Sequence, residues 1–277
     1  MPPLSTPLTN PRSDRVKAVR ALSRRSVRQR TGRFLVEGPQ SVREAVRHHP
    51  EQVLDLYVTE VAAERYAADV VDPARAAGLY VHLVSEEVLA ALCDAESPQG
   101  LAAVCRTPAV SLEDVLASRP RLLVVLTNVR DPGNAGTVIR GADAAGADAV
   151  LVSESSVDVH GPKVVRSTAG SLFHLPVVTG LPIDATLARL REAGIRLLAA
   201  DGAGDDLLGE TDLTATHAWV MGNEAWGLEQ QVRDQCDAVV RVPIYGRAES
   251  LNLAMAATVC LYASAAALHG AEPAATR

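Results

Sequence analysis

Polar side chains suited to catalysis follow several apolar runs of the sequence, and each run is predicted to form a buried strand. The loops after these runs, at 127–134, 201–204, 222–227 and 243–252, provide amide, carboxylate and hydroxyl groups. Two of the intervening segments, 201–204 and 222–227, are rich in glycine, which lets backbone groups approach a ligand closely. Because ligands bind outside the carboxyl ends of the strands of a parallel sheet, we expect these groups to converge there. The pattern predicts a site for a nucleotide-like ligand.

The commoner nucleotide and hydrolase motifs are absent from the sequence. The dinucleotide fingerprint G-x-G-x-x-G does not follow the first strand of the 122–268 region, since Gly133 and Gly136 are wrongly spaced for it. There is no Walker sequence, Ser–His–Asp set or H-E-x-x-H helix. The cysteines form no C-x-x-C pair and no cluster with histidines: Cys93, Cys105, Cys236 and Cys260. We therefore disfavour a dehydrogenase and a P-loop NTPase, and we expect reduced thiols and no bound metal.

The stretch from Leu122 to Gly146 predicts a buried strand, a polar turn and a helix. Residues 131–133 form a turn sequence, because proline presets φ and glycine adopts unusual backbone angles. Asn134 stands where a helix N-cap is favoured, and apolar residues recur at helical spacing after it. Arg140 lies six residues further on, about 240° around a helix. The two side chains therefore do not share one face, and an ordinary solvated Arg140 stays an alternative.

Strands and helices alternate along most of the chain. After residue 121, strands are predicted at 122–126, 149–152, 175–178, 197–200, 219–221 and 239–242. The helices between and after them are predicted at 135–145, 163–172, 185–193, 228–236 and 251–268. This alternation predicts an α/β fold with a parallel sheet and helices on both of its faces.

A smaller α/β unit precedes this region. Its helices are predicted at 14–33, 41–48, 62–77 and 86–94, and its strands at 33–38, 53–58, 80–84 and 100–105. The segment 107–120 has a proline at each end and is predicted to be a linker. We thus expect a disordered tail at 1–13, a small domain at 14–106, a large domain at 121–268 and a second tail at 269–277.

The charge of the chain is unevenly distributed. Its net charge is -6, yet residues 1–50 hold eleven basic and three acidic residues, so this segment carries +8 and the remainder -14. Such asymmetry favours a local contact with a polyanion. The natural phosphate contacts are five arginines: Arg24, Arg25, Arg28, Arg30 and Arg33. Aromatic residues make up only 3% of the chain, which favours folded RNA over stacked single strands, while a merely solvated basic face is the alternative.

Neither end of the chain predicts a membrane segment. Residues 1–11 lack the apolar core of a signal peptide. The stretch Leu251–Leu268 is long and apolar, but alanine dominates it and Asn252, Thr258 and Ser264 interrupt it. Because alanine contributes little to membrane insertion, we expect a buried helix and a cytoplasmic protein.

Three segments together resemble the signatures of the SpoU (TrmH-like) RNA ribose methyltransferases. The first is Asn128–Arg140, NVRDPGNAGTVIR, and the second is Val220–Gly227, VMGNEAWG. The third combines VPI at 242–244 with ESLNLA at 249–254. In addition, residues 33–38 and 99–101 resemble the substrate-binding domain appended in this family. The resemblance spans about residues 14–268, and its strength lies in three motifs in the same order and spacing.

The resemblance implies a SPOUT-type parallel sheet with a C-terminal trefoil knot. It also implies a homodimer with the active site at the subunit interface. The expected methyl donor is S-adenosylmethionine, and the acceptor is a ribose 2′-hydroxyl in RNA. Gly222, Val242 and Leu251 match donor-binding positions, with Asp201 and Ile244 as neighbours. Arg140 matches the catalytic arginine, and the polar residues matched around it are Asn134, Glu224, Ser250 and Asn252.

The chemistry expected of these residues is positioning rather than strong base catalysis. None of the three motifs contains a histidine, and arginine stays protonated in proteins. We therefore expect Arg140 to hold a flanking phosphate and stabilise the developing alkoxide, while Asn134 orients the hydroxyl. Two positions depart from the family pattern: Gly141 replaces a frequent threonine, and Trp226 stands in the second motif, where packing in the dimer contact is favoured over stacking on substrate.

The favoured function is methylation of a ribose in structured RNA, with ribosomal RNA as the expected substrate. The two-domain plan favours ribosomal over transfer RNA only by analogy. A transfer RNA ribose methyltransferase stays open as an alternative. So does a non-catalytic RNA-binding or ribosome-assembly factor, which predicts no binding of the methyl donor.

Overall fold

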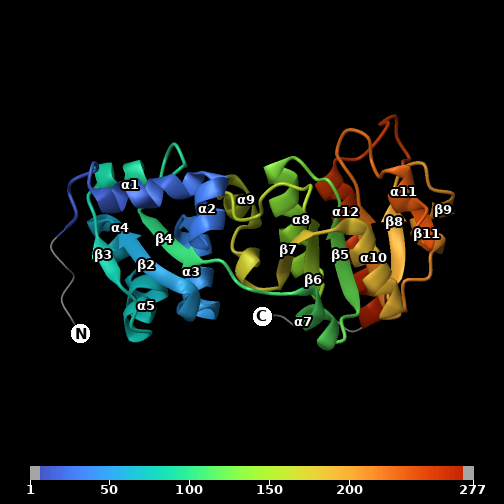
Figure 1. Ribbon diagram of the computed structural model, residues 1–277, viewed down its shortest axis with the longest axis horizontal. Coiled ribbons are helices and arrows are strands. Elements are labelled where there is room, and N and C mark those ends of the chain that lie inside the picture. The colour runs from blue at the N-terminus through green and yellow to red at the C-terminus, as the bar shows by residue number, and fades with distance from the viewer. Residues whose placement is uncertain (1–6, 271–277) are drawn as a thin grey trace. The chain divides into compact units, whose positions relative to one another are not determined.

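The computed structural model describes residues 7–270, and they fold into two compact units (Figure 1). The first unit consists of Met1–Ala109 together with Asp158–His174, and the second of Val110–Val157 together with Leu175–Arg277. The first unit is therefore not one continuous stretch of sequence. This differs from the predicted division at 107–120, which assigned residues 158–174 to the large domain.

The described part of the first unit contains a four-stranded sheet in the order β1-β4-β2-β3. The strands are β1 (Arg33–Glu37), β2 (Val53–Val58), β3 (Val81–Leu83) and β4 (Leu101–Arg106). Strand β4 pairs antiparallel with both β1 and β2, whereas β2 and β3 are parallel. The first five residues of β4, LAAVC, are all buried, as expected for a central strand covered on both faces.

Short helices surround this sheet. They are α1 (Asp14–Arg20), α2 (Arg25–Thr31), α3 (Pro39–His48), α4 (Glu60–Arg65), α5 (Asp72–Ala76), α6 (Glu86–Leu92) and α9 (Pro162–Thr168). The predicted helix 14–33 is divided into α1 and α2 by a 3₁₀ turn at Ala21–Ser23 and an extended Arg24. The predicted helix 62–77 is also interrupted, by a π-turn at Ala67–Val71 just before Pro73, whose nitrogen has no hydrogen to donate.

The predicted disordered tail at 1–13 is ordered where the structure describes it. Leu8 forms a parallel bridge with Val84, in which its N–H donates to Leu83 O at 2.8 Å and its carbonyl accepts from Ser85 N at 3.0 Å. The Leu8 side chain also packs against the apolar core of the first unit. Residues 1–6 and 271–277, which hold the rest of the two predicted tails, lie outside the described residues.

The second unit confirms the predicted parallel sheet. Its described residues form a seven-stranded sheet in the order β7-β6-β5-β10-β8-β11-β9, in which every neighbouring pair is parallel. The strands are β5 (Leu122–Leu126), β6 (Ala149–Ser153), β7 (Val177–Leu181), β8 (Arg196–Ala200), β9 (Asp206–Leu207), β10 (His217–Met221) and β11 (Ala238–Arg241). Each of the six predicted strands is present. The two-residue β9 was not predicted, because it is too short to show a periodic pattern.

The helices of the second unit pack against the strands that hold the site. They are α7 (Leu112–Ala117), α8 (Pro132–Ala144), α10 (Ile183–Glu192), α11 (Gln230–Arg233) and α12 (Leu253–His269). Helix α12 packs against α8 and β10, where Ser264 accepts hydrogen bonds from Trp219 Nε1 at 2.8 Å and lies 2.7 Å from His217 Nε2. Helix α7 begins with a capping box formed by Ser111 and Asp114, and it lies inside the predicted linker. No helix within residues 7–270 is long and apolar enough to cross a membrane.

Candidate active site

A cavity of about 400 Å³ lies at the carboxyl ends of β8, β10 and β11. Because β10 lies between β5 and β8, the segments that follow these strands meet at one edge of the sheet. The three residues matched to donor-binding positions and their two expected neighbours all line this cavity: Gly222, Val242, Leu251, Asp201 and Ile244. Glu224 and Ser250 of the predicted polar set line it as well. The structure thus brings these seven residues together around one cavity.

The wall of the cavity after β10 is a tight hairpin that excludes a side chain at Gly222. A Cβ atom at this position would lie 2.3 Å from the carbonyl carbon and oxygen of Gly227. Asn223 and Gly227 exchange backbone hydrogen bonds of 2.8 and 2.9 Å, and Gly227 has a φ of +71°. Gly222 thus allows two backbone segments to touch beside the cavity, which is the close approach expected from its type.

Asp201 joins the loops that follow β8 and β10. Its carboxylate accepts hydrogen bonds from Ala203 N at 2.9 Å and Leu228 N at 3.3 Å, and it lies 3.7 Å from the guanidinium of Arg233. Since the side chain is only 11% exposed, most of its hydrogen-bonding capacity is used within the protein. Asp201 lines the cavity, and its contacts fix the shape of the two loops that form it.

The three sequence motifs are joined by a continuous chain of hydrogen bonds. Glu224 accepts from Arg130 N at 3.2 Å, from Asp131 N at 3.0 Å and from Asn134 Nδ2 at 3.3 Å. Asn134 Oδ1 in turn accepts from Asn252 Nδ2 at 2.9 Å. The predicted convergence of Asn134, Glu224 and Asn252 is therefore found at the rim of the cavity. We call these three residues the amide–carboxylate network.

Helix capping differs from the prediction and explains why Asn134 is available for this network. The N-cap of α8 is Asp131, whose Oδ1 accepts from Asn134 N at 2.7 Å, so Asn134 lies inside the first turn. Pro132 occupies the first helical position, where its missing N–H costs nothing. At α12 the N-cap is Asn252, whose Oδ1 accepts from Ala254 N and Met255 N while Nδ2 reaches Asn134. Ser250, two residues before this cap, is exposed and lines the cavity.

Arg140 is not brought to the network of its own chain. It lies in the same regular helix as Asn134, so the expected separation of about 240° is retained. Its side chain is exposed, and it forms no hydrogen bond or ion pair with another residue between 7 and 270. Arg140 is therefore free to contact a second molecule.

Two asparagines that the sequence analysis did not select also shape the site. Asn223, which is 6% exposed, donates from Nδ2 to Asn128 O at 2.8 Å and accepts from Ala225 N at 2.8 Å. Asn128 has a φ of +55°, a conformation that asparagine tolerates better than most residues. Each asparagine lies two residues after the end of a buried strand, and this position is the sequence signal that points to such a turn. No histidine is among the described residues that line the cavity.

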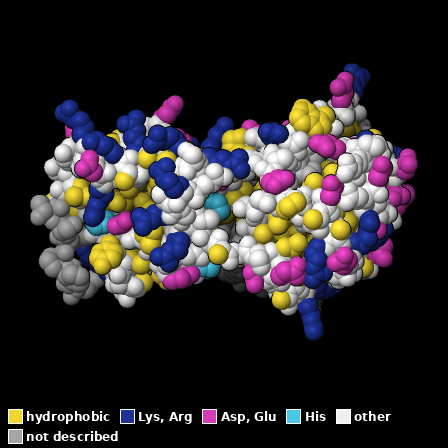
Figure 2. All heavy atoms as spheres, viewed as in Figure 1, with side chains coloured by type: hydrophobic (Ala, Val, Ile, Leu, Met, Phe, Trp, Pro, Cys, Tyr) yellow, Lys and Arg dark blue, Asp and Glu magenta, His cyan; other side chains and the backbone are white. Residues whose placement is uncertain are grey.

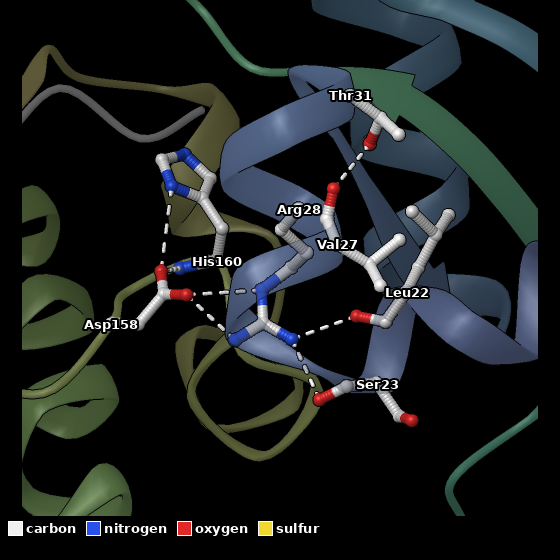
Figure 3. Close-up of polar contacts among 7 residues, drawn as sticks. All are labelled: Leu22, Ser23, Val27, Arg28, Thr31, Asp158 and His160. Carbon is white, nitrogen blue, oxygen red and sulfur yellow. Dashed lines mark hydrogen bonds and ion pairs between the residues drawn. The ribbon is translucent and has the colours of Figure 1, made fainter.

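The predicted phosphate-binding arginines of the first unit divide into two groups. Arg24, Arg25, Arg30 and Arg33 are exposed, and Figure 2 shows Lys and Arg side chains gathered over α1 and α2. We call these four arginines the basic surface. Arg28 is only 6% exposed and bonds inward, to Leu22 O at 2.7 Å, Ser23 O at 2.8 Å and Asp158 Oδ2 at 2.6 Å (Figure 3). Arg28 is thus a structural residue whose guanidinium is not available to RNA.

Family models match both parts of the chain. The SpoU rRNA Methylase family matches residues 121–262, and the MRM3-like substrate binding domain matches residues 13–103. A 23S rRNA (guanosine(2553)-2′-O)-methyltransferase of Bacillus subtilis, RlmP, is 34% identical over 252 residues, which are 91% of this chain and 96% of that protein. A 23S rRNA (uridine(2479)-2′-O)-methyltransferase of Streptomyces viridochromogenes is 36% identical over 87% of this chain and 85% of that protein.

Solved structures agree with these matches. The AdoMet-bound rRNA methyltransferase from Sinorhizobium meliloti has a TM-score of 0.81 at 29% identity, over 94% of this chain and 97% of that one. The SpoU methyltransferase AviRb from Streptomyces viridochromogenes, in complex with AdoMet, has a TM-score of 0.76 at 33% identity, over 91% of this chain and 98% of that one. The geometry of the cavity, the family models and the relatives lead to one conclusion: the chain belongs to the SpoU rRNA methylase family.

Proposed function

We propose that the chain transfers a methyl group from S-adenosylmethionine to a ribose 2′-hydroxyl of ribosomal RNA. The observation that carries this proposal is the amide–carboxylate network at the rim of the cavity. It joins three distant segments at one point, where an acceptor ribose would meet a donor bound in the cavity. Relatives named as 23S rRNA 2′-O-methyltransferases favour ribosomal RNA over transfer RNA as the substrate.

The cavity fits an adenosine-containing donor. Its lining combines apolar side chains, among them Val242, Ile244 and Leu251, with the backbone of Gly222 and Gly202. The space that a Cβ at Gly222 would need is filled by the backbone of Gly227, so the wall of the cavity is main chain rather than side chain. Such walls offer N–H and C=O groups to a base or ribose, and the volume of about 400 Å³ lies in the range of small-molecule sites. When bound, S-adenosylmethionine supplies an activated methyl group.

The residues of this chain then position the acceptor. An amide nitrogen carries two hydrogens, and the network uses one from Asn134 and one from Asn252. Each side chain thus retains one N–H that is suited to a ribose hydroxyl or phosphate. Arg140 holds the phosphate beside the reacting ribose and stabilises the developing alkoxide with its fixed positive charge. With the two asparagines positioning the acceptor and Arg140 stabilising the charge, no histidine is needed at the site.

We further propose that the active molecule is a homodimer with a trefoil knot in each chain. Helix α12 exposes Met255, Val259 and Tyr262 along one face, with 60%, 43% and 52% of their surfaces accessible. Trp226 and Tyr245 near the cavity are 60% and 95% exposed, and a partner chain would cover them. Since Arg140 does not reach the network of its own chain, a dimer that supplies Arg140 to the opposite site accounts for its position. Ribosomal RNA as substrate also implies a cytoplasmic location.

Comparing RNA from cells that lack the protein with RNA from complemented cells tests this function. We expect one additional 2′-O-methyl mark in ribosomal RNA of complemented cells, and none when the complementing chain carries Arg140→Ala. Calorimetry with S-adenosylmethionine provides the second measurement. Donor binding with a new mark in transfer RNA would support the transfer RNA alternative, and absence of donor binding would support a non-catalytic RNA-binding factor.

A further inference from the structure

Two histidines and a glutamate meet in the first unit, outside the methyltransferase site. Glu44 and His48 lie one turn apart on α3, and His174 follows the 3₁₀ turn Ser171–Phe173 at the end of the 158–174 segment. One potential ligand atom from each of the three residues lies within 4.8 Å of the other two. No motif in the sequence indicated this cluster, because His174 is 130 residues from Glu44.

The distances within this cluster suit metal coordination. His48 Nε2 and His174 Nε2 each lie 3.3 Å from the same atom, Glu44 Oε2. Zinc binds imidazole nitrogen and carboxylate oxygen at about 2.0–2.1 Å, so neighbouring ligand atoms of a tetrahedral site lie about 3.3 Å apart. Direct charge-assisted hydrogen bonds are shorter, about 2.7–2.9 Å. The two imidazole rings also meet edge to face, with centroids 5.0 Å apart at 68°.

The surroundings hold the Glu44 carboxylate in place for this role. Arg43 Nε donates to the other oxygen, Oε1, at 2.8 Å, which directs Oε2 toward the histidines. Gly170 leaves room for the side chain, since a Cβ there would lie 2.7 Å from Glu44 Cγ.

We propose that Glu44, His48 and His174 bind a zinc ion, with water as the fourth ligand. Two imidazoles and one carboxylate form a donor set typical of zinc. Arg43 acts from outside by orienting the carboxylate, as residues around metal sites commonly do. The ion would tie the 158–174 segment to α3. The site belongs entirely to the first unit, so its test does not depend on methyl transfer.

Titration calorimetry of the full chain with ZnSO₄ tests this site, after removal of any affinity tag and treatment with a chelator. We expect one zinc ion per chain, and we expect His48→Gln and His174→Gln each to weaken binding roughly tenfold or more. His49→Gln is the matched control, because this neighbouring histidine contacts Glu51 at 3.0 Å instead of the cluster. Arg43→Gln should weaken zinc binding roughly ten- to a hundredfold.

Hydrogen exchange of the unsubstituted chain provides a second measurement that does not rely on folded variants. Zinc should slow exchange in residues 44–48 and 171–174 and leave the second unit unchanged. Failure of the unsubstituted chain to bind zinc would overturn the proposal. So would binding that His48→Gln and His174→Gln leave unchanged, or that protects other segments.

Discussion

Glu224 holds the loop before α8 through its carboxylate, although it lies on the surface. Its two oxygens accept two backbone N–H groups and the side-chain amide of Asn134. Glu224→Gln replaces one accepting oxygen with an NH₂ group that faces N–H donors. We expect kcat/KM to fall about ten- to a hundredfold, since charge-assisted hydrogen bonds are involved, with little change in thermal stability. Methylation kinetics check this, with the exposed Glu210→Gln as control. An unchanged rate would show that the loop does not need this carboxylate.

Substitutions at Arg140 test whether its proposed role in catalysis requires the planar guanidinium or only a positive charge. Lysine keeps the positive charge but lacks the planar fork that grips a phosphate through two parallel bonds. We expect Arg140→Lys to lower kcat about tenfold or more and Arg140→Ala to lower it further. Donor affinity should not change, because the proposed role of Arg140 is to hold the phosphate of the acceptor rather than the donor. A rate for Arg140→Lys close to that of the unsubstituted enzyme would contradict two-point binding.

The buried side chain of His160 should make the first unit less stable toward unfolding at acid pH. Burial lowers the pKa of His160 to about 4 from an ordinary value of 6.5, and its Nε2 has no hydrogen-bond partner among the described residues. Between these values the unfolded chain binds a proton that the folded chain does not, so stability falls as pH decreases. From pH 7.5 to 5 this single group costs about 2 kcal/mol. Calorimetric unfolding at both pH values should show a smaller loss for His160→Leu, and an equal loss would exclude His160 as the cause.

Much of the site at residue level was predictable, because the motif residues are fixed by local backbone and ligand chemistry. The cavity residues Gly222 and Val242 and the network residue Glu224 lie where the motifs indicated. Arg28 was mistaken for a surface residue, because its burial depends on Asp158, which is 130 residues away. The cap of α8 was placed on Asn134 instead of Asp131, since both residue types favour that position.

At the scale of elements, the main difference between the structure and the prediction concerns the segment 158–174, which belongs to the first unit. Its helix was predicted, but its association with the first unit depends on long-range contacts. The ring of Phe34 on β1 lies 4.8 Å from that of His160 and 6.3 Å from that of Phe173. The Arg28–Asp158 pair adds a buried ionic contact (Figure 3). Periodicity identifies helices and strands but does not report which sheet they join, so this partition required the structure.

The Arg28–Asp158 pair predicts how firmly this segment is held. Removing one partner leaves a buried charge unpaired, which typically costs about 3–5 kcal/mol. We expect Arg28→Met and Asp158→Asn to increase hydrogen exchange in residues 22–32 and 158–174. Hydrogen exchange is the suitable probe, because both tryptophans, Trp219 and Trp226, lie in the second unit. The exposed Arg25→Met is the control. A double variant that carries both substitutions measures whether the two residues are coupled. If its increase in exchange equals the sum of the two single increases, the pair is not coupled.

At the scale of the whole molecule, charge is distributed unevenly along the chain. The chain is acidic overall, yet its first 50 residues carry +8 and the rest carries -14. The basic surface places exposed arginines on the first unit, while the donor cavity belongs to the second. The charge asymmetry itself was visible in the sequence, because it does not depend on how the chain folds. Which of the predicted phosphate-binding arginines are exposed depends on the packing of α2. Arg28 is buried by this packing and does not belong to the basic surface.

The salt dependence of RNA binding tests the basic surface. Each phosphate contact releases counterions, so log K for RNA binding falls as log salt rises. Losing one contact makes this negative slope shallower by about 0.7–0.9. Arg24→Gln with Arg25→Gln should therefore weaken binding of a ribosomal RNA fragment and reduce this slope by about 1.4–1.8. The control pair, Arg65→Gln with Arg119→Gln, removes equal charge at exposed positions outside this surface. Filter binding over a KCl series distinguishes the two pairs. If the two double variants have equal slopes, RNA binding responds to the net charge of the molecule. If only the Arg24/Arg25 variant has a shallower slope, the basic surface contacts phosphate.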